Sequence, residues 1–116
     1  MQDSFDGTET IILQPGDSAK PRYFTFAICT SQTANDGAIP YGTTISSVAV
    51  KAFDDGGTDV TAQMVDASSQ SGTVVTVDLN YPTSAGRYSL EFELTLDSGA
   101  VLEFDFTRVY AEDIAA

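Results

Sequence analysis

The side chains that usually carry out acid–base and nucleophilic chemistry are scarce in this sequence. The 116 residues contain no histidine, which removes the commonest general base and metal ligand. A serine–histidine–aspartate or cysteine–histidine arrangement is therefore impossible. The one cysteine, Cys29, follows an apolar segment and has no basic neighbour in sequence, so we interpret it as an inert core thiol and not as a nucleophile.

Carboxylates are numerous, and they raise the questions of hydrolysis and of metal binding. A pair of carboxylates can hydrolyse glycosides, but this chemistry needs a deep cleft, which a domain of this size rarely builds. The loop 54–59 contains Asp54, Asp55 and Asp59 among glycines, a composition that suits Ca²⁺. It lacks the EF-hand spacing, and a turn explains the same residues. The sequence therefore predicts a protein that is not an enzyme and has no cofactor, with these three aspartates as the calcium candidate.

Charge and length exclude several classes of partner. Seventeen acidic residues stand against five basic ones, giving a net charge of −12. Because nucleic acids and anionic membranes are bound by clusters of Lys and Arg, neither is an expected partner. The acids are scattered, which favours a role in solubility. The N-terminus lacks the basic and apolar regions of a signal peptide, and no apolar run approaches the roughly 20 residues of a membrane helix.

Strand periodicity runs through most of the chain. Apolar and polar residues alternate over 88–96 and again over 100–108, and the turn Asp97-Ser98-Gly99 joins them into a long hairpin. A bulge is expected near Ser46-Ser47, where Ile45 falls out of phase with the apolar residues that follow. The other expected strands are 10–13, 22–29, 44–53, 59–65 and 73–79. Residues 1–8 and 111–116 are expected to be flexible tails of a single domain, 1–116.

The three-residue turn ending at Gly99 fixes which residues of the hairpin oppose each other. One face pairs apolar residues: Leu96 with Ala100, Leu94 with Leu102, and Phe92 with Phe104. The other face pairs acids: Glu93 with Glu103, and Glu91 with Asp105. Opposed like charges destabilise a sheet, although Lys51 on a neighbouring strand could partly neutralise them. Two interpretations stay open: a solvated face that favours solubility, or a contact surface for a basic partner or a neighbouring subunit.

Seven strands with closely spaced turns predict an all-β, immunoglobulin-like Greek-key sandwich of about seven antiparallel strands. Gly86 and Tyr88 lie where such folds place a tyrosine that hydrogen-bonds back to the preceding corner. An ordinary core tyrosine would also fit this position. The disulfide and the core tryptophan of antibody domains are absent, because the chain has one cysteine and no tryptophan.

Tyrosines, glycines and turn residues stand out within 20–110 in the segments 23–26, 39–48, 59–61, 71–75, 86–88 and 96–99. In their placement the chain resembles the small immunoglobulin-like structural proteins of tailed bacteriophages, of the fiber–tail adaptor or neck and tail accessory type. The resemblance implies a virion structural protein, made in the host cytoplasm, that joins neighbouring subunits at the neck or tail. Its implied partners are other virion proteins or copies of itself, with the oligomeric state left open.

Two other functions remain possible at this point. One is a stand-alone binding module, such as a carbohydrate- or surface-recognition domain of a bacterial adhesin, for which Tyr41, Tyr81 and Tyr110 are available aromatic residues. The other is an accessory domain of a secreted enzyme, although no linker flanks the chain. Self-association separates the first from a virion subunit, because binding modules are usually monomers.

Overall fold

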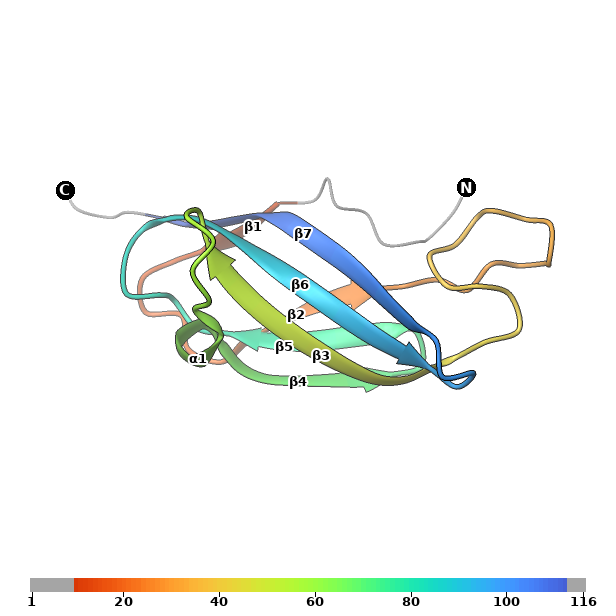
Figure 1. The fold of residues 1–116 in the computed structure, drawn as a ribbon. Helices are drawn as coiled ribbons and strands as arrows, with labels where there is room; N and C mark the ends of the chain where they lie inside the picture. Colours follow the sequence, from red (N-terminus) through yellow and green to blue (C-terminus); the bar gives the residue numbers. More distant parts are fainter. Residues whose placement is uncertain (1–9, 113–116) are drawn as a thin grey trace.

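The chain folds into two β-sheets that face each other across one apolar core (Figure 1). The structure is a computed structural model that describes residues 10–112. Its elements are β1 (Ile11–Leu13), β2 (Lys20–Thr25), β3 (Ile45–Asp54), α1 (Thr61–Met64), β4 (Val65–Ser71), β5 (Val74–Leu79), β6 (Gly86–Leu96) and β7 (Val101–Ala111). The predicted all-β sandwich is confirmed.

The strand order places the long hairpin at the centre of the larger sheet. That sheet has the order β1-β7-β6-β3, and the smaller sheet has the order β2-β5-β4. Neighbouring strands are antiparallel except β1 and β7, which run parallel, so the expectation of antiparallel strands throughout is wrong at this edge. The reason is that the chain crosses from β1 directly into the other sheet, leaving β1 beside the last strand in the same direction.

Alternating side chains of both sheets fill the core. Every second residue of β6 points inward, from Tyr88 to Leu96, and the intervening residues point to solvent or to the sheet rim. Phe24 of one sheet lies 4.7 Å from Phe92 of the other, measured between ring centroids, and Phe26 lies 5.4 Å from Phe92. Such tilted and edge-on contacts add about 0.5–1.5 kcal/mol per pair beyond the area that they bury. Phenylalanine rings from the two sides of the core therefore contact one another, among the aliphatic side chains that make up the rest of it.

The segment 59–65 differs most from its prediction as a strand. Residues Thr61–Met64 form a short helix, and the strand β4 begins at Val65 and continues to Ser71. Asp59 accepts a hydrogen bond from the backbone N–H of Thr61, and the Thr61 hydroxyl accepts one from the N–H of Ala52. These contacts tie the segment to the edge of β3 and turn it into a helical bend, with Met64 buried beneath it.

Two further boundaries differ from the prediction. The strand expected over 22–29 ends at Thr25, and the chain then continues as a loop to residue 44, interrupted by an isolated bridge between Ile28 and Ile39. β7 extends to Ala111, which is 5% exposed and pairs with Leu13, so Ala111 is not part of a flexible tail. Met1–Thr8 and residues 113–116 lie outside the described residues. The bulge expected near Ser46-Ser47 is present, between Ile45 and Ser47.

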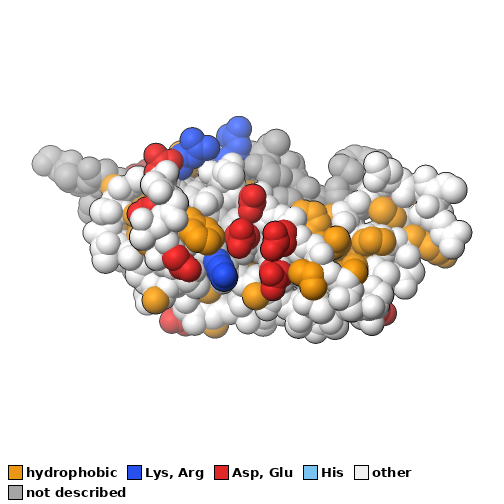
Figure 2. All heavy atoms as spheres, viewed as in Figure 1, with side chains coloured by type: hydrophobic (Ala, Val, Ile, Leu, Met, Phe, Trp, Pro, Cys, Tyr) orange, Lys and Arg blue, Asp and Glu red, His pale blue; other side chains and the backbone are white. Residues whose placement is uncertain are grey.

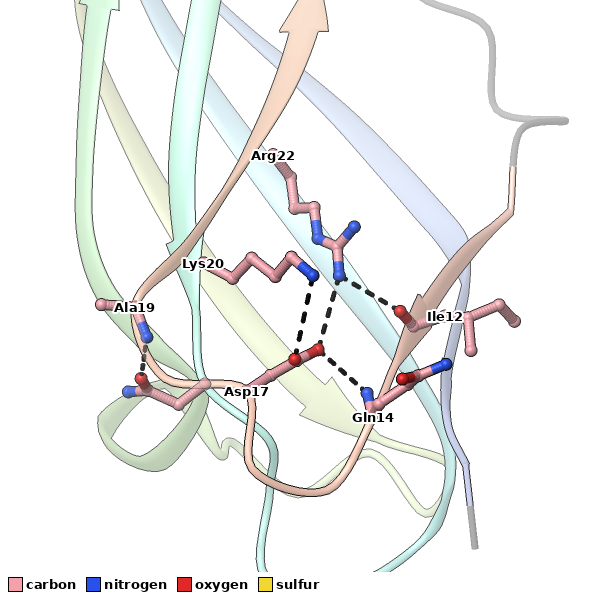
Figure 3. A network of polar contacts seen from close by, with 7 residues as sticks. Ile12, Gln14, Asp17, Ala19, Lys20 and Arg22 are labelled. Carbon is pink, nitrogen blue, oxygen red and sulfur yellow. Dashed lines mark hydrogen bonds and ion pairs between the residues drawn. The ribbon is translucent and has the colours of Figure 1, made fainter. Parts of the chain in front are cut away.

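Asp17 organises the turn between β1 and β2 (Figure 3). Its carboxylate accepts a hydrogen bond from the backbone N–H of Gln14 at 2.9 Å. It also forms ion pairs with Lys20 at 4.0 Å and with Arg22 at 3.7 Å. Arg22 in turn donates a hydrogen bond from Nη2 to the carbonyl oxygen of Ile12 at 3.1 Å. This network connects the first strand of one sheet to the edge strand of the other.

Candidate interaction surface

The acidic face of the hairpin has the pairing that the sequence predicts. Glu91 lies opposite Asp105, and Glu93 lies opposite Glu103, on adjacent strands β6 and β7. We call these four residues the acidic face. In the view of Figure 1, β3, β6 and β7 face the reader. Figure 2, seen from the same side, shows a close group of acidic side chains beside a basic one on this surface. Three of the four side chains are exposed, and Glu91 is half-buried.

The turn that sets this pairing is also as predicted. The backbone N–H of Leu96 donates to the carbonyl of Ala100 at 2.8 Å, which closes the hairpin. Gly99 has a φ of +92°, in the left-handed region that glycine adopts without strain. Because the turn fixes the register, β6 and β7 cannot shift along each other to separate the opposed acidic side chains.

β3 supplies the third side of the acidic face. Lys51 lies opposite Glu91, and Ala49 lies opposite Glu93. Between these residues and Glu103 there is a recess of about 110 Å³. The recess exists because Ala49 is small where its neighbours are long. Ala49 was not singled out from the sequence, since the pairing of β3 with β6 passes through a bulge that the turn chemistry does not determine.

Repulsion within the acidic face is only partly offset. Among residues 10–112, the ion pairs within 4.0 Å are those of Asp17 with Lys20 and Arg22, so Lys51 forms no close pair with the acidic face. Lys51 also lowers the pKa of Asp59, after the larger contributions of the Thr61 side chain and the Thr61 backbone N–H, which both hydrogen-bond to the carboxylate. One cation is thus shared between two groups of acids, and a basic group from another molecule would complete the charge balance.

Tyr88 makes the hydrogen bond that the tyrosine corner requires. Its hydroxyl donates to the carbonyl oxygen of Ser84 at 2.7 Å, four residues back along the chain, and its side chain is 5% exposed. Gly86, between them, has a φ of +148°, a conformation that L side chains rarely adopt. The corner fixes the start of β6 and so supports the strand that carries half of the acidic face.

The candidate calcium loop uses its aspartates to build a turn. Asp54 Oδ1 accepts hydrogen bonds from the backbone N–H groups of Gly56 and Thr58, each at 2.9 Å. Asp59 caps the N–H of Thr61, as described above. Within the described residues, no group of three or more acidic or cysteine side chains lies close enough together to hold a metal ion. The structure therefore does not bring Asp54, Asp55 and Asp59 together as a metal site.

Cys29 is half-buried and lies in the loop after β2, so its expected place in the core is wrong. Its thiol donates weakly to the carbonyl oxygen of Gly37, with a sulfur–oxygen distance of 3.5 Å. The loop folds back on itself here, so that residues 27–29 lie beside residues 37–39. The backbone N–H of Cys29 donates a hydrogen bond to the carbonyl of Ile39 between these two segments. Nothing in its described surroundings brings a base to the thiol.

Comparison with known proteins adds no family. None of the helices in the described part of the chain is long and apolar enough to span a membrane. No protein-family model matches the sequence, and no curated protein matches it.

Proposed function

We propose that this protein is a non-enzymatic structural protein of a phage virion, which joins neighbouring subunits at the neck or tail. The observation that carries the proposal is the acidic face: four carboxylates held in opposed pairs on the exposed side of the most extensively paired strands. A face with this arrangement is stabilised when a basic surface of another molecule covers it, because each new contact relieves existing repulsion.

The strand order supports the immunoglobulin type that the resemblance implies. β3, β6 and β7 are adjacent in the order that immunoglobulin sandwiches give to strands C, F and G. β2, β5 and β4 are adjacent in the order B, E and D of the opposite sheet. The Tyr88 corner lies at the start of the strand equivalent to F, where these folds place it.

The recess beside Ala49 suggests how a partner engages. Three carboxylates, those of Glu91, Glu93 and Glu103, line a space of about 110 Å³ together with Lys51 and the short side chain of Ala49. A lysine or arginine of the partner would enter this space and approach several carboxylates at once. Such contacts fix the orientation of two subunits and accelerate their encounter more than they add affinity.

Solution mass tests the proposal, measured by size-exclusion chromatography with light scattering at low and high protein concentration. We expect a discrete closed oligomer that the double substitution Glu91→Lys with Glu93→Lys converts to monomer. The matched control carries Asp66→Lys with Glu112→Lys, which makes the same charge change at exposed acids outside the acidic face. A monomer at every concentration, or an oligomer that survives the first pair of substitutions, contradicts assembly of copies of this chain through the acidic face.

The second candidate function is a stand-alone binding module, and a monomer would favour it. Of the aromatic residues available for surface recognition, Tyr41 is 52% exposed. Tyr81 packs against the core and donates its hydroxyl to the carbonyl of Glu112, and Tyr110 is half-buried. Of the three tyrosines named from the sequence, the exposed one that favours a binding module is therefore Tyr41, on the long loop.

A further inference from the structure

Phe53 lies on the wrong face of its strand for a core residue. Val50 and Ala52 of β3 point into the core, and Lys51 between them points to solvent. Phe53 follows this alternation outward, where it is half-buried, and it is absent from the side chains that pack against the core. Core packing therefore does not explain why a large aromatic ring lies on the outer face of this sheet, and an apolar residue at such a position often has a function.

The Phe53 side chain forms part of a groove at one end of the larger sheet. The groove has a volume of about 450 Å³, within the range of small-molecule sites. The residues that line it include Phe53 and Asp54 of β3, Asp55 of the following turn, Arg87 and Ser89 of β6, and Thr107 of β7. A second hollow of about 190 Å³ continues past Arg87 and shares both aspartates. We call the larger space the Phe53 groove.

The polar groups of the Phe53 groove are largely without protein partners. Arg87 donates through Nε to the carbonyl of Thr107 at 3.4 Å, and within residues 10–112 its two terminal nitrogens have no ion pair or hydrogen bond. Among residues 10–112, the carboxylate of Asp55 and the hydroxyl of Ser89 likewise form no hydrogen bond or ion pair. An arginine fork and a carboxylate therefore line one space without neutralising each other.

We propose that the Phe53 groove binds a neutral carbohydrate. A sugar has an apolar face of C–H groups that would lie against the Phe53 ring, as apolar and aromatic walls do in most ligand sites. Its neighbouring hydroxyls both donate and accept hydrogen bonds. They can accept from the Arg87 fork, donate to the Asp55 carboxylate, and do both with Ser89.

The charges in the groove argue against a charged ligand. An anion would meet Arg87 but would also face Asp54 and Asp55, in a protein whose net charge is −12. A cation would meet the aspartates but would lie beside the arginine. A neutral ligand with hydroxyls satisfies both kinds of group without either penalty. This inference does not depend on the proposed virion role, because the groove lies outside the acidic face.

NMR titration of the ¹⁵N-labelled protein with the methyl glycosides of glucose, galactose, mannose and N-acetylglucosamine tests the inference. We expect at least one glycoside to shift the backbone amide signals of Phe53, Arg87, Ser89 and Thr107 in a saturable way. Phe53→Ala and Arg87→Gln should each weaken this binding at least tenfold. The matched controls are Tyr23→Ala, an exposed aromatic on the opposite sheet, and Arg108→Gln, an exposed arginine outside the groove, and both should leave binding unchanged.

Several results would overturn the inference. These are no saturable shift with any of the four glycosides, shifts confined to residues outside the groove, or binding that survives both Phe53→Ala and Arg87→Gln. Arg87→Gln keeps the test decisive if Phe53→Ala fails to fold, since Arg87 is exposed and its substitution removes no core contact. Loss of the oligomer in the acidic-face variant would not affect sugar binding, so the two proposals fail separately.

Discussion

The hydroxyl of Tyr88 lies 2.7 Å from the carbonyl oxygen of Ser84, and this one hydrogen bond joins the start of the central strand β6 to the corner that precedes it. The tyrosine ring belongs to the core, while Ser84 is exposed. The bond therefore links the interior of the sandwich to the corner loop, which Thr83 also anchors through two hydrogen bonds to Gln63.

Tyr88→Phe should lower the free energy of unfolding by about 1 kcal/mol, the usual net value of a hydrogen bond. The cost stays near this value because Ser84 is an exposed residue, so that water can replace the lost hydroxyl at its carbonyl. Urea denaturation measures the effect, and Tyr23→Phe, which removes the hydroxyl of a tyrosine that is 66% exposed, is the control. Equal stability of the two variants would show that the corner bond contributes nothing.

Glu93→Gln should raise the free energy of unfolding by about 0.2–1 kcal/mol, because it removes one charge from an opposed pair of carboxylates. The gain should shrink in high salt, which screens exposed charges. Thermal denaturation at low and high salt measures both effects. Asp66→Asn on β4 serves as the control for a change of net charge alone. A loss of stability in Glu93→Gln would mean that Glu93 makes a favourable contact and that repulsion does not dominate.

Gly37→Ala should destabilise the protein by about 1–3 kcal/mol, the usual cost of forcing extra volume into a packed site. A Cβ at this position would lie 2.5 Å from the carbonyl oxygen of Ala27 and 2.7 Å from the nitrogen of Cys29, both backbone atoms that cannot move alone. Gly56→Ala is the matched control, since its Cβ would come no closer than 3.5 Å to Asp54 Oδ1. Chemical denaturation of both variants decides whether the loop tolerates the added methyl group.

Arg22→Met should loosen β1 without unfolding the core. The substitution keeps much of the apolar stem but removes the hydrogen bond to Ile12 and the ion pair with Asp17. Because hydrogen bonds to charged groups contribute about 1.5–3 kcal/mol, amide hydrogen exchange of 11–13 should accelerate at least tenfold. Arg108→Met on β7 is the control. Unchanged exchange in β1 would show that β7 alone holds this strand.

Acid should release the contact between Asp36 and Thr30. The Thr30 hydroxyl, and then its backbone N–H, hydrogen-bond to the carboxylate and lower the pKa of Asp36 below 3.8. A lowered pKa means that the contact is at full strength above pH 3.8 and is lost as the pH falls through the lower folded-state value. The amide shift of Thr30 should follow this titration, and Asp36→Asn should abolish it. A midpoint above 3.8 would contradict the hydrogen bond.

The parts of the fold that the sequence predicts are those fixed by local chemistry. A three-residue turn and strict alternation determine the register of 90–95 against 101–106, so all four members of the acidic face were found in their correct pairs. A bulge between Tyr88 and Leu90, which the alternation did not predict, shifts the pairing of 86–88 by one residue. The bulge at Ser46-Ser47 followed from a break in the same alternation.

The parts that sequence reasoning missed depend on distant contacts. β4 is rich in serine and shows no apolar alternation, and it becomes a strand because β5 offers it a hydrogen-bonding edge. α1 forms where Thr61 bonds to Ala52 of β3, nine residues earlier. The recess at Ala49 and the Phe53 groove both arise where β3 meets β6, a pairing across 40 or so residues that local propensity does not encode.

The parallel pairing of β1 with β7 has a mechanical consequence. Ile11 lies beside Val109 and Leu13 beside Ala111, so a pull on residue 10 away from residue 112 draws the two strands past each other. Their hydrogen bonds, together with the one from the N–H of Glu112 to the carbonyl of Leu13, would then be loaded in shear. They would bear the force simultaneously and would not break one after another. Tension applied at these two points is therefore resisted first by the hydrogen bonds between β1 and β7, before it acts on the packing of the core.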